Sequence, residues 1–438
     1  MTLFPERRLV RIAALWFLVA TLCSAWPIFL WPTGFILALL VGAVSIDAIL
    51  LGRCPPVLIQ RIVPTRVVVG RPVETRIRIE NRSDRPTVIS VDDEWPEDLG
   101  SASPSFEDVL VEAGSGVDLC ATLCPRRRGD RPFGRLVVFE RGPLGLLRRR
   151  SVDDQEALVS VYPDARKLMR AAGLDPRELL GRSGLQRSRR RDHGSEFESL
   201  REYVIGDDPR HVDWAATARH GHLVTRLFQH ERNYTLVVAV DTSRLMAAEC
   251  SDGRTKLDHA VDAALTLALA ALGRGDRVEV VLFDRTIRGR VAPRGNRGDI
   301  GPIVELLRRA EPTTVEANYR ELVRGLLTQR RGRALVVVLT DFAESETAGI
   351  EAPLRLLQKH HRTLTVALRD PIFARLRPGG PTEIHDPFEK LAIDELLVDR
   401  EMVLARLRRA AVQTLDLPPE HVIAPLLNRY LEFRYSGA

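Results

Sequence analysis

An almost unbroken apolar stretch at residues 9–51 constrains this chain more than any other part of its sequence. It divides into two blocks, residues 9–26 and 35–51, each about as long as one bilayer crossing requires. Two prolines and a glycine between the blocks favour a tight turn. The first block lacks a clear small-x-small cleavage site and a second block follows at once, which disfavours a signal peptide. We predict a transmembrane hairpin for residues 1–55, with Asp47 at the membrane interface and without a special role.

Arginines flank the hairpin on both sides, whereas the turn between its blocks carries no Lys or Arg. They are Arg7, Arg8 and Arg11 before the first block and Arg53, Arg61 and Arg66 after the second. Since positively charged flanks stay in the cytoplasm, both ends of the hairpin and the chain beyond it are expected there. The five scattered cysteines also favour a reducing compartment over a disulfide scaffold.

From residue 56 to residue 162 the pattern changes to short segments with a period of two. Residues 67–72 and 73–81, for example, alternate apolar with polar side chains, and Gly, Pro, Asn and Asp separate the segments. Several short strands at this spacing predict a small β-sandwich of immunoglobulin-like kind. Since no acid, base or nucleophile constellation stands out in it, we interpret it as a spacer or interaction domain.

Residues 163–233 are predicted to form a linker followed by a charged segment. The linker contains a basic run at residues 187–191, and no aromatic residues interleave with it, so stacking on nucleic acid is not expected. A solvated or lipid-facing run suits a chain whose formal net charge is +6 and whose basic residues are mostly arginine. We therefore expect the lipid bilayer as a partner, and no nucleic acid.

The charged segment is interpreted as a surface for a partner protein. Its candidate partner-binding residues are Arg201, Asp207, Asp208, Arg210, Asp213, Trp214 and Arg219. We expect the arginines to pair with the carboxylates, with Trp214 as the apolar anchor of the surface. Because the segment also carries His211, His220 and His222, a metal-dependent hydrolase or nuclease is the alternative. It shows no recognised ligand spacing, and the nearby arginines would oppose a bound cation.

From residue 234 to residue 438, Val- and Leu-rich strands alternate with helical segments. This alternation predicts an α/β domain with a parallel sheet that helices cover on both faces. Three of the predicted strands end in aspartate, at Asp241, Asp284 and Asp341. Open α/β sheets bind their ligands at the carboxyl ends of the strands, so this edge is the candidate site.

The residue types at this edge are those that bind hard cations. The candidate metal ligands are Asp241, Ser243, Asp341 and either Thr313 or Thr314. Their carboxylate and hydroxyl oxygens suit Mg²⁺, Mn²⁺ or Ca²⁺. The pattern resembles the metal-ion-dependent adhesion site of von Willebrand factor A domains, Asp-x-Ser-x-Ser, except that Leu245 replaces the second serine. One oxygen ligand is therefore missing, and the alternative is that both aspartates only cap loops and helix starts.

The chain as a whole resembles the bacterial domain of unknown function 58 family. The resemblance rests on Glu196-Phe197, Leu200 to Tyr203, Gly206 to Asp208, Arg210, Val212 to Trp214, Ala218-Arg219, Leu223, Glu231-Arg232, Asp241, Ser243 and Gly142 to Leu146. It implies a von Willebrand factor A-like domain anchored in the bacterial inner (cytoplasmic) membrane by two spans. Family members are commonly encoded beside MoxR-type AAA+ ATPases, so such an ATPase is the implied partner in complex assembly, metal insertion or envelope maintenance.

Two functions of different classes are consistent with these features. The first is a non-enzymatic binding module whose sheet edge takes an acidic residue of a partner, with or without a bridging divalent cation. It is favoured because the chain has neither a phosphate-binding loop nor a nucleophile-elbow pattern. The second is a metal-dependent hydrolase or nuclease that uses Asp241, Asp341 and the histidine-rich stretch.

Overall fold

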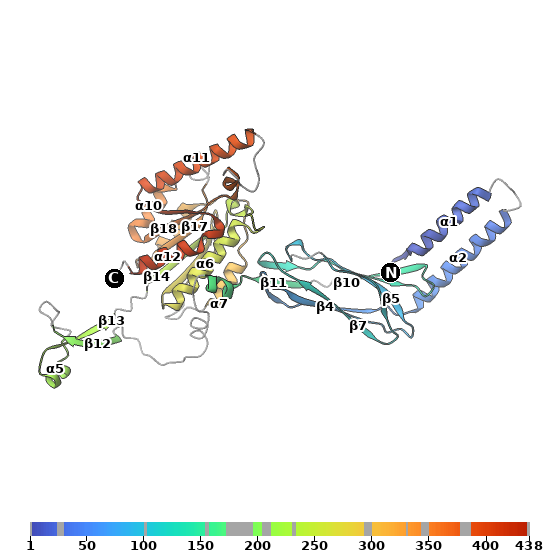
Figure 1. Ribbon diagram of the computed structural model, residues 1–438, viewed down its shortest axis with the longest axis horizontal. Coiled ribbons are helices and arrows are strands. Elements are labelled where there is room, and N and C mark those ends of the chain that lie inside the picture. The colour runs from blue at the N-terminus through green and yellow to red at the C-terminus, as the bar shows by residue number, and fades with distance from the viewer. Residues whose placement is uncertain are drawn as a thin grey trace. The chain divides into compact units, whose positions relative to one another are not determined.

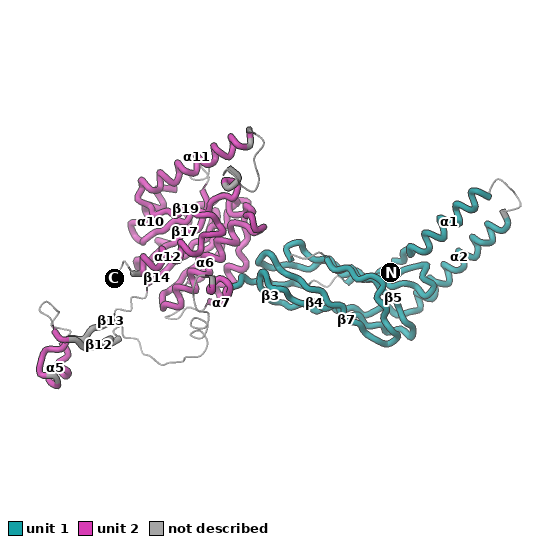
Figure 2. Tube along the Cα trace, in the orientation of Figure 1, with its two compact units in different colours: residues 1–164 teal, residues 165–438 magenta. Residues whose placement is uncertain are grey.

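The computed structural model describes residues 2–23, 30–99, 103–153, 157–171, 196–203, 212–229, 234–292, 300–329, 332–342, 350–376 and 387–435. The chain divides into two units, residues 1–164 and 165–438 (Figure 2). Each unit has its own apolar cores, and the buried groups discussed below lie within one unit or the other.

The first unit begins with two apolar helices, α1 (Arg7–Cys23) and α2 (Leu30–Arg53), which run side by side (Figure 1). The indole Nε1 of Trp16 donates to Thr33 O at 3.1 Å and joins them. Among the described residues one helix, from Trp31 to Arg53, is long and apolar enough to cross a membrane, and a signal sequence would have the same character. Exposed apolar side chains such as Phe17 and Phe35 cover both helices.

Apart from its two helices, the first unit consists mainly of short strands, and those of two sheets pair antiparallel, as the period of two predicts. One sheet has the order β1-β10-β9-β5-β6 and another the order β2-β4-β7. The strands of these sheets are β1 (Thr2–Pro5), β2 (Leu58–Ile62), β4 (Val73–Glu80), β5 (Thr87–Asp93), β6 (Ser105–Val111), β7 (Gly116–Leu123), β9 (Leu136–Arg141) and β10 (Leu147–Asp153). Ile79 of β4, Val91 of β5 and Val138 of β9 share one core, so the two sheets pack on each other.

Three further strands complete the β-rich part, in the order β3-β11-β8. They are β3 (Arg66–Val68), β8 (Gly129–Pro132) and β11 (Leu158–Tyr162). They enclose a second small core around Trp95 and Phe133, whose rings meet edge to face. Strand β1 was not predicted, because its four residues directly precede an apolar helix and carry no strand pattern of their own.

The second unit is built on a six-stranded sheet of order β16-β15-β14-β17-β18-β19. Its strands are β14 (Thr235–Asp241), β15 (Arg277–Phe283), β16 (Ile287–Val291), β17 (Leu335–Thr340), β18 (Arg362–Leu368) and β19 (Gln413–Leu417). All neighbours are parallel except β15 and β16, which form an antiparallel hairpin at one edge. The expected parallel sheet is therefore mostly correct. The hairpin was missed because β16 has the mixed sequence IRGRV.

Helices cover both faces of this sheet (Figure 1). Val238 and Val240 of β14 point toward α6 (Lys256–Gly273), α7 (Ile300–Arg308) and α12 (Ile423–Tyr435). Val237 and Ala239 point the other way, toward α8 (Tyr319–Gln329), α10 (Glu351–His360) and α11 (Pro387–Arg409). A strand buried on both faces has to be apolar at every position, which explains the continuous run LVVAV.

Part of the segment expected to be a linker is structured. Helix α3 (Ala165–Ala171) buries Met169 in the core beside α6. Strands β12 (Glu196–Glu202) and β13 (Val224–Gln229) form an antiparallel hairpin, and the seven-residue helix α5 (Trp214–His220) lies between them in the chain.

Candidate functional site

The structure brings three of the four predicted metal ligands to one edge of the six-stranded sheet. Strands β14 and β17 are parallel neighbours, so Asp241 at the end of one and Asp341 just after the other lie at the same edge. Asp241 and Ser243 are fully buried, and Asp341 is 4% exposed. The candidate edge is therefore an interior site, and its hydrogen bonds decide what it can bind.

The Asp241 carboxylate is held by two donors from its own sheet edge. Oδ1 accepts from the Ser243 backbone N–H at 2.7 Å, and Oδ2 accepts from Thr340 Oγ1 at 2.5 Å. Burial raises the pKa of Asp241 to about 6, and the hydrogen bonds from Thr340 and Ser243 only partly offset this. Asp241 is thus a weaker acid than an ordinary aspartate, and its side chain is shielded from solvent.

The Asp341 carboxylate, by contrast, is surrounded by cations. Oδ2 accepts from Lys256 Nζ at 2.5 Å, while Oδ1 accepts from the Phe342 backbone N–H at 2.7 Å and from the Arg400 guanidinium. Lys256 Nζ also donates to Asp370 Oδ2 at 2.7 Å, and Arg400 also pairs with Asp416. Burial acts to lower the pKa of Lys256, but the Asp341 and Asp370 carboxylates outweigh it and the pKa is raised.

The fourth predicted ligand, Thr313, faces a different carboxylate. Its hydroxyl lies 3.0 Å from Thr242 O and 3.2 Å from Asp284 Oδ2 and donates to them, which ties the Thr313 loop to the end of β15. Leu245, where the adhesion motif has a serine, lies in a short 3-10 helix, Arg244–Ala247, and supplies no side-chain oxygen. The full set of oxygens that the motif requires is therefore not assembled at Asp241.

The oxygen atoms of the predicted ligands are not arranged to bind a divalent cation. Both oxygens of Asp341 already accept hydrogen bonds, two of them from full positive charges, and a metal ion would meet those charges at contact distance. Across the described ranges, no group of three or more His, Cys, Asp or Glu side chains is placed to hold a metal ion. The carboxyl edge is instead a closed network of ion pairs and hydrogen bonds.

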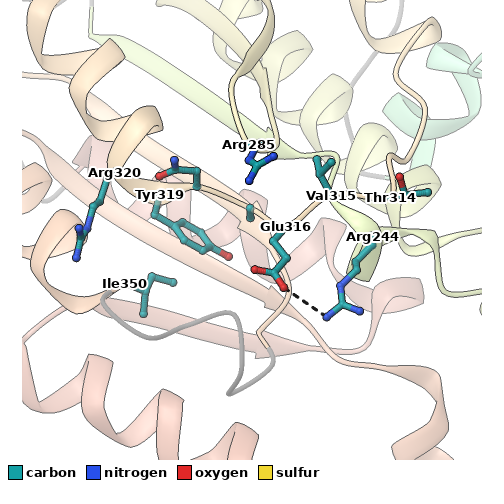
Figure 3. Close-up of a pocket in the computed structure, with 10 residues that line it drawn as sticks. Arg244, Arg285, Thr314, Val315, Glu316, Tyr319, Arg320 and Ile350 are labelled. Carbon is teal, nitrogen blue, oxygen red and sulfur yellow. Dashed lines mark ion pairs between the residues drawn. The ribbon is translucent and has the colours of Figure 1, made fainter.

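An arginine-lined groove of about 640 Å³ opens above this network, and sequence reasoning missed it (Figure 3). Arg244 follows β14, Arg285 follows β15, and Arg320 lies in the first turn of α8. Arg244 pairs with Glu316 at 3.8 Å. Arg285 and Arg320 are exposed and form no ion pair with the part of the chain described here. The available signal was an arginine three residues beyond Asp241 and another one residue beyond Asp284.

Tyr319 connects the groove to the buried network. Its hydroxyl shares a 2.7 Å hydrogen bond with Thr340 Oγ1, the same atom that donates to Asp241, and also donates to Asp341 O at 3.3 Å. Its ring packs against Phe283 and Phe342. Tyr319 of the groove lining is therefore connected by hydrogen bonds to both aspartates. We expect a substitution at either aspartate to alter the position of Tyr319.

Part of the predicted partner-binding segment lies within the described residues. Asp213 is the N-cap of α5 and accepts from the Ala215 and Ala216 backbone N–H groups at 3.0 Å. Trp214, expected to be an apolar anchor, is 69% exposed, because it begins a short helix that projects beyond its hairpin (Figure 1). Arg219 Nε donates to Ala215 O in the same helix.

The other members of that set are placed as follows. Arg201 lies in β12, whereas Asp207, Asp208, Arg210 and His211 lie outside the described residues. His222 is 3.5 Å from Glu202, and both side chains are at least half exposed. The exposed imidazole of His222 thus has a carboxylate neighbour on the same hairpin.

The protein is a mixed α/β protein of two units. A β-rich unit that carries an apolar helix is followed by a unit built on a mostly parallel sheet with a charged carboxyl edge. Residues 199–414 match the family model described as "Protein of unknown function DUF58". The chain belongs to this family over those residues, as its sequence motifs predicted.

The relatives found are uncharacterized proteins. One comes from Mycobacterium bovis and two from Mycobacterium tuberculosis, and each is 27% identical over 247 residues, covering 51% of this chain and 70% of its own. Among solved structures, a CARDB domain from Pyrococcus furiosus in complex with di-metal ions matches with a TM-score of 0.18 and 13% identity, over 25% of this chain and 90% of its own. Escherichia coli alpha-2-macroglobulin matches with a TM-score of 0.19 and 20% identity, over 25% and 7%. Both scores are too low to inform the fold or function.

Proposed function

We propose that this protein is a non-enzymatic, membrane-anchored binding module whose arginine-lined groove takes an acidic segment of a partner protein. The observation that carries the proposal is the charge of the groove at the carboxyl edge. Among the described residues that line it, Arg244, Arg285 and Arg320 carry guanidinium groups and Glu316 carries a carboxylate. A concave surface of one sign attracts a partner of the opposite sign, and arginine pairs well with carboxylates.

The fold that presents this groove is von Willebrand factor A-like in our proposal. Its carboxyl edge is where open α/β sheets bind ligands, and the groove lies there rather than on a helical face. We propose a MoxR-type AAA+ ATPase as the partner, in complex assembly or envelope maintenance. A binding role rather than an enzymatic one is supported by Asp241 and Asp341, which are buried and already hydrogen bonded, so that neither is presented to a substrate as a base.

Reversing charge in the groove tests this function. Arg285→Glu combined with Arg320→Glu should weaken binding of the full chain to the MoxR-type ATPase of the same organism at least about tenfold, mostly through slower association. Surface plasmon resonance at two salt concentrations would measure this, and the wild-type affinity should fall as salt rises.

The sheet offers a matched control at its opposite edge. Arg277 and Arg362 are exposed arginines at the amino ends of β15 and β18. Arg277→Glu with Arg362→Glu makes the same change of net charge and should leave the affinity within about twofold of wild type. Equal losses in the two double variants, or no binding by the wild-type chain, would contradict the proposed groove or partner.

The proposed location is the bacterial cytoplasmic membrane, with two spans formed by α1 and α2 and both soluble parts in the cytoplasm. It is supported by the apolar surface of both helices and by arginines in the first turns of α1 and at the end of α2. A carboxyl-terminal green fluorescent protein fusion should then fluoresce, and an alkaline phosphatase fusion at the same point should be inactive. The opposite pair of results would place the second unit outside the cytoplasm.

A further inference from the structure

The buried ammonium group of Lys256 pairs with Asp341, one of the predicted metal ligands. Its side chain is fully buried, and Nζ lies 2.5 Å from Asp341 Oδ2 and 2.7 Å from Asp370 Oδ2. The two carboxylates follow neighbouring parallel strands, β17 and β18. One positive charge between them therefore joins two loops of the carboxyl edge.

The position of Lys256 in its helix shows that this contact is specific. Lys256 is the first residue of α6, after the N-cap Thr255, where the positive end of the helix dipole disfavours a cation. A fully buried ammonium in that position is stable only if carboxylates compensate both the dipole and the loss of water. Asp341 and Asp370 provide that compensation.

We propose that Lys256 supplies, from within the chain, the positive charge that a divalent cation supplies in adhesion-type sites. Together with Arg400 it brings two positive charges to the Asp341 carboxylate. A metal ion at Asp341 would have to displace the Lys256 ammonium from a carboxylate that compensates its buried charge, so the edge takes one form whether or not divalent cations are present. Binding of an acidic partner in the groove is then independent of metal, a consequence that rests on the proposed function.

Two substitutions of Lys256 in the full-length chain test this inference without any partner. Lys256→Ala leaves an open space between Asp341 and Asp370 and should create a site for Mn²⁺. Lys256→Met removes the same charge but fills the space, so it should bind no Mn²⁺. Electron paramagnetic resonance of free Mn²⁺ measures the binding. The melting temperature of Lys256→Ala should rise by about 3–5 °C at a Mn²⁺ concentration about ten times Kd.

The wild-type protein gives the second measurement. Its melting temperature should be the same in Mg²⁺, Mn²⁺ and EDTA, which supports the inference even if Lys256→Ala fails to fold. A wild-type melting temperature that rises in Mn²⁺, with the rise abolished by Asp241→Asn or Asp341→Asn, would overturn it. A folded Lys256→Ala that takes up no more Mn²⁺ than Lys256→Met would overturn it as well.

Binding to the ATPase in EDTA distinguishes this inference from the proposed function. Equal affinity in EDTA and in Mg²⁺ supports a built-in cation, whereas loss of binding in EDTA, for an ATPase whose own fold is unchanged there, contradicts it. No binding in either buffer overturns the proposed partner alone, because the Mn²⁺ measurements are made without it.

Discussion

Replacing Asp47 by alanine will lower the free energy of unfolding of the first unit by about 4 kcal/mol. The Asp47 carboxylate is fully buried and accepts three backbone N–H groups, those of Leu144 at 2.8 Å, Leu146 at 3.0 Å and Leu147 at 2.8 Å. Alanine leaves all three donors buried without an acceptor, at about 1–3 kcal/mol each, less what local rearrangement recovers.

Fluorescence of the buried Trp95 during urea unfolding of the detergent-solubilised full chain would measure the loss, and amide hydrogen exchange would locate it at Leu144 to Leu147. Asp118→Ala is the matched control, because Asp118 is an exposed acid of the same unit. It should change stability by less than about 0.5 kcal/mol. Similar losses of stability for both substitutions would mean that Asp47 does not stabilise the turn at Leu144 to Leu147.

The turn that Asp47 holds also explains two glycines. A Cβ on Gly142 would lie 2.7 Å from both Asp47 carboxylate oxygens, so only glycine allows the close approach. Gly145 has a φ of +68°, in the left-handed region that glycine tolerates best. Gly142 and Gly145 both belong to the segment Gly142 to Leu146 on which the sequence resemblance partly rests. In the structure this segment binds the Asp47 side chain of α2.

A side chain of the β-rich part donates to carbonyl groups at and just beyond the end of α2. Arg149, buried against Glu140, donates to Leu51 O at 3.2 Å, Cys54 O at 2.8 Å and Pro55 O at 3.2 Å. Helix carbonyls left without partners at the carboxyl end need such donors. Asp47 and Arg149 together bind the end of α2 to the β-rich part. The Asp47 side chain is fully buried and holds a turn, so the expectation that it has no special role is wrong.

The two aspartates at the sheet edge were predictable from sequence and the residues that bind them were not. Asp241 and Asp341 end Val-rich runs, and parallel neighbours place their carboxyl ends together, so local pattern was sufficient. Lys256 and Arg400 are 85 and 59 residues from Asp341 in the chain. Their pairing depends on how α6 and α11 pack, which periodicity does not specify. The one local clue was a lysine at the first position of an Ala- and Leu-rich helix.

The same distinction applies to Asp47 and Trp214. Asp47 is an acid within an apolar helix, and Trp214 is an apolar ring beside an aspartate. In both cases the local sequence does not determine whether the side chain is buried. The first is buried because a turn about 100 residues later brings it three N–H donors. The second is exposed because its helix has seven residues and only Ala216 among its described side chains is buried. Burial in both cases depends on tertiary partners.

Asp341→Ala should destabilise the second unit by about 3–5 kcal/mol, because it leaves Lys256 and Arg400 as buried cations with one carboxylate partner fewer. Amide hydrogen exchange of β14 and β17 in the full chain would show the loss as protection factors lower by a factor on the order of 10²–10³. Asp394→Ala, at an exposed acid of α11, is the control and should leave protection unchanged.

The double variant Asp341→Ala with Lys256→Met removes both partners, so it should be less destabilised than the sum of the single changes by about 1–3 kcal/mol. Strict additivity would show that Lys256 and Asp341 do not stabilise each other, and the carboxyl edge would then owe its form to packing alone.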